Sequence, residues 1–362
     1  MNKRVAIMTF HRALNYGAIL QAFALERVLA EMGVPAEIID YRCPRIECIY
    51  RPFDVRHCKN ISSGVKKCVK SFGMIKKRGR FHAFTKQQLS VTKKCKTAKA
   101  LERTASEFHA VITGSDQVWN PDATGGDFHY FLDFAGSDVK KIAYAASIGY
   151  SAFPQKYESK CKELLKQFDL ISVREKSVCQ AVAALAEREV EQTLDPTLLL
   201  SASRWLEIAK KPRGLPERYL LVSMMEGCNY TVEKARALAS SKGCGLVLIN
   251  PTLKQQQTCR DFILYTAASP EEFVGMFAAA EAVVTNSFHG VAFSIIFQKE
   301  FYAETSNAEK SARITDLLAL FDLSDRLLPR EGEGHIDWEQ VNGKLQKEQS
   351  KSLSWLKHSM EF

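Results

Sequence analysis

The stretch RVAIMTFHRALNYGAILQAFALERVLAEMG, residues 4–33, indicates the type of fold that this chain adopts. Residues 4–10 are apolar and rich in β-branched side chains, as in a buried strand. Residues 18–32 then repeat apolar side chains at helical spacing, and Gly33 ends the repeat. Residues 36–41 predict a second strand. A strand, a helix and a strand in this order predict a parallel sheet with a right-handed crossover.

The same alternation continues along the chain after an interruption. In the first half we expect strands at 110–113, 141–146, 170–173 and 190–194, with helices at 159–168 and 176–186. In the second half we expect strands at 219–224, 246–249, 282–284 and 301–303, with helices at 231–241, 270–280, 290–297 and 311–321. The pattern predicts an α/β chain of two Rossmann-like domains facing across a cleft, with a C-terminal helix that packs back. The expected domains are 1–199, with a basic insertion at about 51–100, then 200–334, and a helical segment at 335–362.

Composition indicates the class of protein. With 362 residues, 46% hydrophobic and 25% charged, the chain is typical of a globular protein of two domains. No apolar run is long enough to span a bilayer, and His11-Arg12 interrupts the first one too early for a signal peptide. The ten cysteines form neither CxxC pairs nor a cluster with histidine. We therefore expect reduced thiols, a cytoplasmic location and no bound metal.

Positive charge is concentrated in the expected insertion. Residues 51–100 contain fifteen Lys or Arg and one acid, Asp54, a net +14 that leaves −5 for the rest of the +9 chain. Such a cluster is typical of a surface for nucleic acid, anionic membrane or a phosphorylated substrate. The alternative is a mobile, solvated insertion without a partner, because the segment contains several glycines and serines and its periodicity is weak.

Polar clusters follow five of the expected strands. In parallel sheets, ligands bind beyond the carboxyl ends of the strands, so these clusters are expected to meet at one edge. The clusters are Asn15-Tyr16-Gly17, Gly114-Ser115-Asp116-Gln117, Ser147-Ile148-Gly149, Arg174-Glu175 and Asn286-Ser287-Phe288-His289.

His289 lies where a buried strand is expected to turn into a helix. A helix start presents unpaired N–H groups and the positive end of the peptide dipoles, so His289 beside Asn286 and Ser287 predicts an anion site. The alternative is a capped helix with a structural histidine. Arg174 closes an apolar strand and needs an anionic partner, which is either a ligand or a carboxylate of the same chain, Glu175 or Asp116.

The remaining candidates also leave alternatives open. Asp116 follows Gly114-Ser115, a turn that lets the backbone approach a ligand. Trp119 is either a core residue or a face on which a sugar ring stacks. A simple turn explains Asn15 and Tyr16 as well as a binding role does. The chain has no GxGxxG or GK[ST] loop, which argues against a dinucleotide or P-loop nucleotide site.

Taken together, six motifs resemble the polysaccharide pyruvyl transferase family. They are NYGA (15–18), GSDQVWNP (114–121), YAASIG (144–149), SVRE (172–175), LDPTLLL (194–200) and TNSFHG (285–290). The resemblance covers nearly the whole chain, and the segment at 51–80 is its least family-like part. It implies a fold similar to the two-domain glycosyltransferase B type. It also implies transfer of the enolpyruvyl unit of phosphoenolpyruvate onto two hydroxyls of one sugar, giving a cyclic ketal and phosphate.

The resemblance also implies roles for the candidate residues. Phosphoenolpyruvate is the donor substrate, and neither a metal nor another cofactor is implied. Arg174 and the helix start at Asn286, Ser287, His289 and Gly290 would hold its phosphate and carboxylate, with Lys310 and Arg313 as further contacts. His289 would also move protons, and Asp116 would act as a base for the acceptor. The acceptor side would include Asn15, Tyr16, Ser115, Gln117 and Trp119.

The expected function is that of a cytoplasmic ketal pyruvyltransferase acting on a cell-surface glycan or its lipid-diphosphate-linked precursor. The alternatives are a nucleotide-sugar glycosyltransferase of similar architecture and a basic binding protein that has lost catalysis. We do not expect a nucleic-acid partner. The basic segment is expected either to touch an anionic membrane at the inner face or to have no partner. The cations proposed for that contact are Lys66, Lys67, Lys70, Lys76, Lys77, Arg78 and Arg80, with Phe72, Met74 and Ile75 as an apolar anchor.

Overall fold

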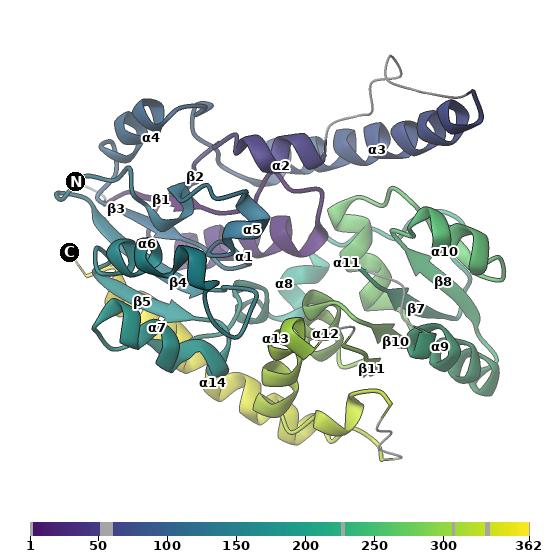
Figure 1. Ribbon diagram of the computed structural model, residues 1–362. Helices are drawn as coiled ribbons and strands as arrows, with labels where there is room; N and C mark the ends of the chain where they lie inside the picture. The colour runs from purple at the N-terminus through teal and green to yellow at the C-terminus, as the bar shows by residue number, and fades with distance from the viewer. Residues whose placement is uncertain (1–2, 51–60, 226–228, 306–307, 330–333, 362) are drawn as a thin grey trace.

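The computed structural model describes residues 3–50, 61–225, 229–305, 308–329 and 334–361 (Figure 1). At positions 61–72, 229 and 308–311 it describes the backbone alone. Two parallel sheets lie side by side, each with helices on its faces, and the last helix runs back beneath the first sheet (Figure 1). The predicted α/β fold with two sheets and a returning C-terminal helix is therefore confirmed.

The first sheet has six parallel strands in the order β2-β1-β3-β4-β5-β6. The strands are β1 (Val5–Met8), β2 (Ala36–Ile38), β3 (Ala110–Thr113), β4 (Lys140–Ala146), β5 (Leu170–Val173) and β6 (Glu191–Gln192). Strands β1, β3 and most of β4 are buried on both faces, as expected for apolar runs covered by helices.

The second sheet has five parallel strands in the order β11-β10-β7-β8-β9. The strands are β7 (Tyr219–Ser223), β8 (Gly245–Ile249), β9 (Ile263–Tyr265), β10 (Ala282–Thr285) and β11 (Glu300–Ala303). Strand β9 is absent from the sequence-based prediction. It is a three-residue edge strand that is only partly buried, so its sequence lacks the apolar run of the central strands.

Fourteen α-helices occur in the described part of the chain. They are α1 (Tyr16–Glu31), α2 (Pro44–Ile49), α3 (Ile61–Gln88), α4 (Ala98–Ala105), α5 (Pro121–Thr124), α6 (Gln155–Leu165), α7 (Cys179–Ala186), α8 (Ala202–Leu206), α9 (Asn229–Lys242), α10 (Leu253–Thr258), α11 (Pro270–Ala279), α12 (Phe288–Ile296), α13 (Ala308–Leu320) and α14 (Trp338–Ser359). Short 3₁₀ turns include η3 (Lys176–Val178) and η4 (Pro196–Leu199).

Two helices begin two residues earlier than their apolar pattern predicts, because polar side chains cap them. The Asn15 side chain accepts hydrogen bonds from the backbone N–H groups of Gly17 and Ala18, so α1 starts at Tyr16. Ser287 caps α12 by accepting from the backbone of Gly290. His289 consequently lies inside the first turn of α12 rather than before the helix.

The basic segment differs most from the prediction. Its largest part is the 28-residue helix α3, which extends from the first domain across the second (Figure 1). Phe81 and Phe84 of α3 are buried in the main core, so residues 73–88 are not a solvated insertion. Residues 51–60 lie outside the described part of the chain.

Helix α3 also joins the two domains through its cations. The Lys77 ammonium donates to the Asn250 side chain at 2.8 Å and lies 4.5 Å above the ring of Tyr16. Burial lowers the pKa of Lys77 to about 7. Arg80 pairs with Glu272 of α11. Lys77 is therefore not available to a membrane surface, contrary to the sequence-based expectation.

Aromatic rings continue the hydrophobic core from one domain into the other. Tyr16 stacks on Phe273 of α11 with ring centroids 4.6 Å apart. Trp205 of α8 lies between Phe23 of α1 and Phe293 of α12, at centroid distances of 5.6 and 5.0 Å. One cluster of buried hydrophobic side chains thus includes residues of both sheets, and the two domains contact each other through apolar and aromatic side chains.

Helix α14 packs back against the first domain. The Ser352 hydroxyl accepts a hydrogen bond from the backbone N–H of Leu194, just after β6. The Trp355 ring lies 5.9 Å from that of Tyr144 on β4. The chain therefore crosses to the second domain and returns to support the first. None of the helices in the described ranges is long and apolar enough to cross a membrane.

Candidate active site

The carboxyl ends of both sheets bring the predicted polar clusters to one edge. Loops after β3, β4, β5 and β6 contribute Ser115, Ser147, Arg174 and Asp195 from the first domain. The second domain contributes His289 through α12, which follows β10. Within each sheet the strands are parallel, so their carboxyl ends lie at one edge, which is where ligands bind in such sheets.

Asp195 is at the centre of this edge and is completely buried. Its Oδ2 accepts hydrogen bonds from Ser115 Oγ at 2.6 Å and from Arg174 Nη1 at 3.0 Å. Its Oδ1 accepts from both the backbone N–H and the hydroxyl of Thr197. Burial alone would raise the pKa of Asp195, but nearby His289, Arg174 and Ser115 outweigh it and hold the pKa well below its usual value.

Arg174 is held between two carboxylates. Its Nε donates to Glu175 Oε1 at 3.1 Å, and its guanidinium lies 4.2 Å from the centre of the Phe288 ring. Burial tends to lower the pKa of Arg174, but Glu175 and Asp195 raise it above the ordinary value, so the group stays charged. Of the two partners that the sequence left open, Glu175 is the one hydrogen-bonded to Arg174. We name Arg174, Glu175, Asp195, Ser115 and His289 the buried charge cluster.

His289 reaches this cluster across the contact between the domains. Its Nε2 lies 3.7 Å from Asp195 Oδ2, farther than a hydrogen bond, and its side chain is almost buried. The ring rests on the backbone of Gly17, where an added Cβ would be 1.9 Å from Nδ1. A side chain at position 290 is also excluded by lack of space, because a Cβ there would be 2.1 Å from Thr285 Oγ1. Gly17 is therefore required for His289 to take this position, and Gly290 for the close approach of α12 to Thr285.

Asp116, Gln117 and Arg313 lie beside the cluster. Asp116 has φ 77°, a left-handed backbone that aspartate adopts more readily than most residues. With the Gln117 amide oxygen turned toward Arg313, both Nη atoms of Arg313 donate to it at 2.6 and 2.9 Å. Burial, and then the charge of Arg174, lowers the pKa of Arg313. Asp116 and Gln117 are half-buried, so this side of the cluster is open to a substrate.

Buried polar atoms without a hydrogen-bond partner gather at this site. Among the described residues they include Arg174 Nη2, Arg313 Nε, His289 Nε2 and Glu175 Oε2. A buried polar atom that lacks a partner costs free energy, on the order of 1–3 kcal/mol. Two of these atoms are donors of positively charged groups and one belongs to an imidazole. The arrangement therefore suits a ligand with several anionic oxygens.

Only part of the Arg174 guanidinium is free to donate hydrogen bonds to a ligand. Its Nε and Nη1 are used by Glu175 and Asp195, so only Nη2 remains for a substrate. A bidentate contact through Nε and one Nη atom is therefore not open to a ligand of Arg174. Arg313 supplies the second guanidinium at the site. The side chain of Lys310, the other proposed phosphate contact, lies outside the described side chains.

Two residues expected at the acceptor are instead part of the core. Trp119 is fully buried and stacks on Phe131 at 5.5 Å, so no sugar ring can reach its face. Tyr16 is buried between the domains, and its hydroxyl donates to the Ala268 carbonyl at 2.9 Å. For Trp119 the core alternative is correct, and Tyr16 joins the domains.

The other candidates have defined local roles. Ser115 is buried and positions Asp195, so it does not face solvent. Asn15 caps α1, and Asn286 accepts from the backbone N–H of Met225 at 2.7 Å. Asn15, Ser287 and Asn286 are half-buried at the same edge. They stay candidates for substrate contacts.

The sequence-based candidate list omits Asp195, although this residue lies in the LDPTLLL motif at 194–200. Its signal was the same as for the other candidates, because Asp195 directly follows an expected strand at its carboxyl end. The strand is only two residues long, so the sequence gives little indication that the aspartate faces the site.

No group of three or more His, Cys, Asp or Glu side chains in the described part of the chain is arranged to hold a metal ion. The family model for polysaccharide pyruvyl transferases matches residues 15–306, from the cap of α1 through β11. The chain belongs to the polysaccharide pyruvyl transferase family. Membership implies a transferase that acts on a polysaccharide, and the match includes every residue of the buried charge cluster.

Other comparisons add little to this membership. No curated protein matches the chain in sequence. The chain is similar to UDP-N-acetylglucosamine 2-epimerase from Rickettsia bellii, with 10% identity, 99% of each chain covered and a TM-score of 0.45. It is also similar to Arabidopsis thaliana UGT89C1 complexed with UDP-L-rhamnose, with 10% identity, all of both chains covered and a TM-score of 0.48. A putative epimerase of the same kind from Listeria monocytogenes has 11% identity, 100% and 92% coverage and a TM-score of 0.48. These values say nothing about what the chain binds.

Proposed function

We propose that the chain transfers the pyruvyl unit of phosphoenolpyruvate onto two hydroxyls of one sugar, forming a cyclic ketal and releasing phosphate. The observation that carries the proposal is the set of unpartnered buried atoms on Arg174, Arg313 and His289. Phosphoenolpyruvate has a phosphate and a carboxylate, and both need cationic or N–H donors in a place sheltered from water.

Donor binding would use both domains. Arg174 Nη2 and Arg313 Nε can each donate to an anionic oxygen, and the first turn of α12 at Ser287–Gly290 adds the positive end of a helix dipole. Glu175 and Asp195 hold Arg174 in one orientation before the donor arrives. The groups proposed to bind phosphoenolpyruvate therefore need little rearrangement when it binds.

The chemistry requires two protons to move. One acceptor hydroxyl attacks the central carbon of phosphoenolpyruvate as the methylene carbon takes up a proton and becomes a methyl group. The second hydroxyl then displaces phosphate and closes the ketal. Of the two hydroxyl protons, one ends on the methyl group and one leaves with phosphate. His289 Nε2 is placed to carry a proton on the donor side, and Asp116 is our candidate base for the acceptor.

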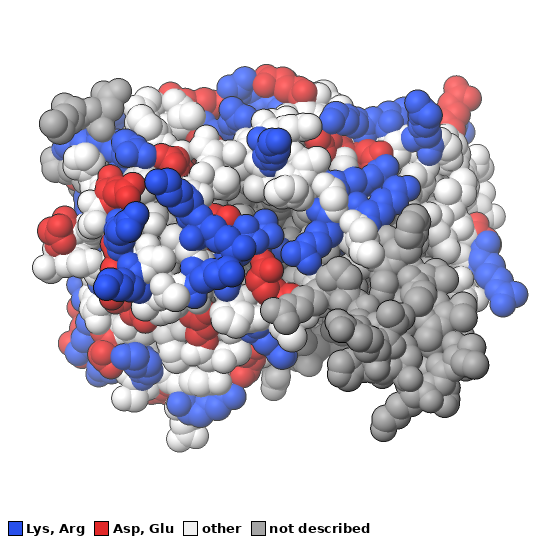
Figure 2. Space-filling view, turned by 90° about the horizontal axis from the view of Figure 1, so that it is seen from above, with Lys and Arg blue, Asp and Glu red and all other residues white. Residues whose placement is uncertain are grey.

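The acceptor is proposed to be a saccharide of a cell-surface glycan or of its lipid-diphosphate-linked precursor. Part of the basic surface is suited to a peripheral contact with an anionic membrane. Figure 2 looks down on the face that carries α3 and shows lysine and arginine side chains gathered across its middle. Lys76 of α3 is exposed beside Lys210, Lys211 and Arg213, and together they line a groove of about 610 Å³.

Binding of phosphoenolpyruvate tests the proposal without knowledge of the acceptor. We expect millimolar phosphoenolpyruvate to raise the melting temperature of the protein, because a ligand that binds only the folded state stabilises it. UDP-N-acetylglucosamine serves as the nucleotide-sugar comparison and should leave the melting temperature unchanged. Stabilisation by the nucleotide sugar alone would contradict the proposal and favour a glycosyltransferase.

The His289→Ala variant connects this binding to the proposed site. It should lose the response to phosphoenolpyruvate, since it lacks the imidazole at the donor position. His358→Ala is the matched control, because His358 lies on the exposed surface of α14. An equal response in both variants would place the donor elsewhere.

A further inference from the structure

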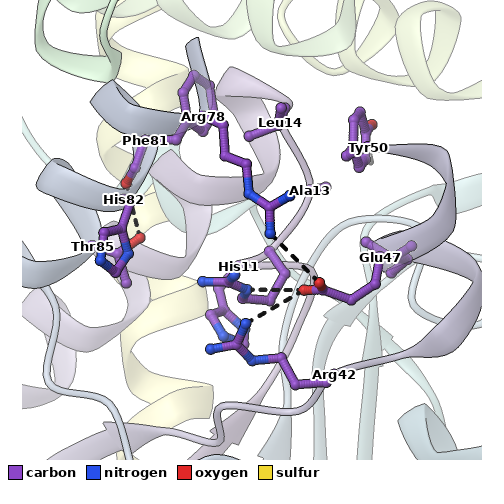
Figure 3. A pocket seen from close by; sticks show the side chains of 12 residues that line it. His11, Ala13, Leu14, Arg42, Glu47, Tyr50, Arg78, Phe81, His82 and Thr85 are labelled. Atoms are coloured by element: carbon purple, nitrogen blue, oxygen red, sulfur yellow. Dashed lines mark hydrogen bonds and ion pairs between the residues drawn. The ribbon is translucent and has the colours of Figure 1, made fainter. Parts of the chain in front are cut away.

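A second group of cations surrounds a pocket outside the buried charge cluster. The pocket has a volume of about 240 Å³ and lies between the loop after β1, helix α2 and helix α3 (Figure 3). Arg12 comes from the loop after β1, Arg42 from the segment between β2 and α2, and Arg78 from α3. Their side chains converge on one carboxylate, that of Glu47 of α2. We name Arg12, Arg42, Arg78 and Glu47 the arginine pocket.

Glu47 does not satisfy the three guanidinium groups. Its oxygens lie 3.4 Å from Arg12 Nε, 3.6 Å from Arg42 Nη1 and 3.8 Å from Arg78 Nη2. Charge-assisted hydrogen bonds between such groups are usually about 2.7–2.9 Å long. The arginines are therefore arranged around Glu47 at distances that leave each with unused donor capacity.

Other contacts fix these cations in place. Arg42 Nη2 donates to Asp40 Oδ2 at 2.8 Å, and His11 Nε2 lies 3.3 Å from Asp40 Oδ1. Arg42 Nε is buried and has no hydrogen-bond partner among the described residues. Burial tends to raise the pKa of Asp40, but His11 and Arg42 outweigh it and lower the pKa, so Asp40 is ionised. The three arginines of the pocket thus face two carboxylates, Glu47 in the pocket and Asp40 beside it, and a positive balance remains.

The pocket lies on the acceptor side of the proposed active site. The loop that carries Arg12 follows β1, whose neighbour β3 leads to Asp116. Thr9 Oγ1 donates to the Ser115 carbonyl at 3.2 Å, which joins the two loops. Tyr50 also lines the pocket, and burial and then the charge of Asp116 raise the pKa of its hydroxyl.

We propose that the arginine pocket binds a phosphate or diphosphate group of the acceptor, with Glu47 as the internal anion that this group displaces. The proposal rests on the pyruvyl transfer proposed above for the role of the ligand as acceptor. Three guanidiniums match the several oxygens and the double charge of phosphate better than a single carboxylate does. The volume is below the roughly 300–1,000 Å³ of pockets that hold a whole ligand, so it suits one charged group of a larger substrate.

Calorimetric titration with inorganic pyrophosphate tests the site directly. Arg78→Gln should weaken binding by about tenfold, the loss of one charge-assisted contact. Arg103→Gln, an exposed arginine on α4, is the matched control and should bind like the wild type. Glu47→Gln should bind pyrophosphate severalfold more tightly, because it removes the competing negative charge. Equal affinities for Arg78→Gln and Arg103→Gln, or weaker binding by Glu47→Gln, would overturn the proposal.

Two further titrations separate this pocket from the donor site and from a membrane headgroup. The first titration uses Arg174→Lys, whose donor site is impaired, and this variant should bind pyrophosphate with the affinity of the wild type. The second uses the wild type, which should bind phosphoenolpyruvate with the same affinity in the absence of pyrophosphate and in its saturating presence. Mutual exclusion of the two ligands would make the pocket the donor's phosphate site and overturn the proposal. Phosphatidylglycerol vesicles should not displace pyrophosphate, and displacement would indicate a lipid headgroup as the true ligand. Failure of phosphoenolpyruvate to bind would contradict the proposed function and would leave pyrophosphate binding in the pocket unaffected.

Discussion

The buried charge cluster and the arginine pocket both set arginines against carboxylates, but they do so in opposite ways. In the cluster, Asp195 accepts four hydrogen bonds of 2.6–3.0 Å and is completely shielded from water. In the pocket, Glu47 is partly exposed and its three arginines remain 3.4–3.8 Å away. The same residue types therefore form a closed network in one place and an open one in the other.

The closed network and the open group of charges should respond differently to substitution. Removing one partner from a closed, buried network leaves another charge unpaired in a medium of low dielectric constant, which is costly. Removing one partner from an open, hydrated group costs little stability, because water replaces it. Cluster substitutions should therefore act on folding and catalysis together, whereas pocket substitutions should act on binding alone.

The largest expected effect is on stability. Asp195→Asn leaves Arg174 and His289 without their shared carboxylate, and we expect it to lower the free energy of unfolding by about 3–5 kcal/mol. Glu47→Gln should change it by less than about 1 kcal/mol. Urea denaturation of both variants measures the contrast. Equal losses would mean that the two regions do not differ as described.

Turnover provides the second test. His289→Ala should weaken donor binding by roughly 2–4 kcal/mol, because it removes a group that meets the substrate while leaving few buried charges unpaired. Phosphate release with phosphoenolpyruvate and a glycan acceptor measures this loss, with folding checked by circular dichroism. Full activity in a normally folded variant would remove His289 from the site.

Arg174 requires a different expectation. The sequence suggests that Arg174→Ala abolishes turnover with the fold intact. In the structure, Arg174 balances two buried carboxylates, so its removal should also destabilise the protein. Arg174→Lys keeps the charge but cannot reach both Glu175 and Asp195 in the same geometry, and it should lose activity with a smaller loss of stability.

Acid sensitivity is the third test. The pKa of Asp195 in the folded protein is below its ordinary value of 3.8. As pH falls below about 4, the unfolded chain takes up a proton that the folded one does not, so stability decreases. Relative to Asp195→Asn, the wild type should lose up to about 1.4 kcal/mol per pH unit in that range. Unfolding curves between pH 5 and 3 that run parallel for the two proteins would show that Asp195 is not the group responsible.

Membrane association should respond more weakly. Among the described side chains of the proposed membrane segment, Lys77 is buried, Arg80 is paired with Glu272 and Arg78 lies in the arginine pocket. Exchange of Lys76, Lys210 and Lys211 for Gln should weaken binding to anionic vesicles by about 1 kcal/mol per cation at low salt. Co-sedimentation decides the point. If the wild type does not bind anionic vesicles at all, no membrane contact exists.

The smallest expected effect is that of metal chelation. The proposed donor site supplies positive charge through Arg174, Arg313 and the start of α12, so EDTA should leave turnover unchanged. Phosphate release measured before and after dialysis against EDTA tests this. Activity that is lost and then restored by a divalent ion would contradict the proposal.

Sequence patterns predicted the sheets well and the site in part. Buried parallel strands such as β3 and β10 are apolar on both faces, so their positions are visible in the sequence. Strand-end position also predicted that Arg174, Asp116 and His289 lie at the carboxyl edge of the sheets, while their roles toward a substrate stay predictions. The sequence did not predict that Trp119 is buried, because a tryptophan at this position is compatible both with a hydrophobic core and with a surface on which a sugar ring stacks.

Contacts distant in sequence account for the rest. Helix α3 packs on α11 through Arg80 and Glu272, which are 192 residues apart, so the sequence near α3 does not show which element covers it. The arginine pocket likewise needs three elements to meet at Glu47. Local periodicity contains no information about contacts between segments that are distant in the sequence.

The return of α14 to the first domain has a consequence for synthesis on the ribosome. The hydroxyl that satisfies Leu194 belongs to Ser352, and the ring against Tyr144 belongs to Trp355, so both are translated long after β4 and β6. Domains usually begin to fold as they emerge, from the N-terminus onward. Here the first domain must wait with an unpaired backbone N–H one residue before Asp195. The backbone beside the buried charge cluster therefore gains its last hydrogen-bond partner only when the end of α14 has left the exit tunnel.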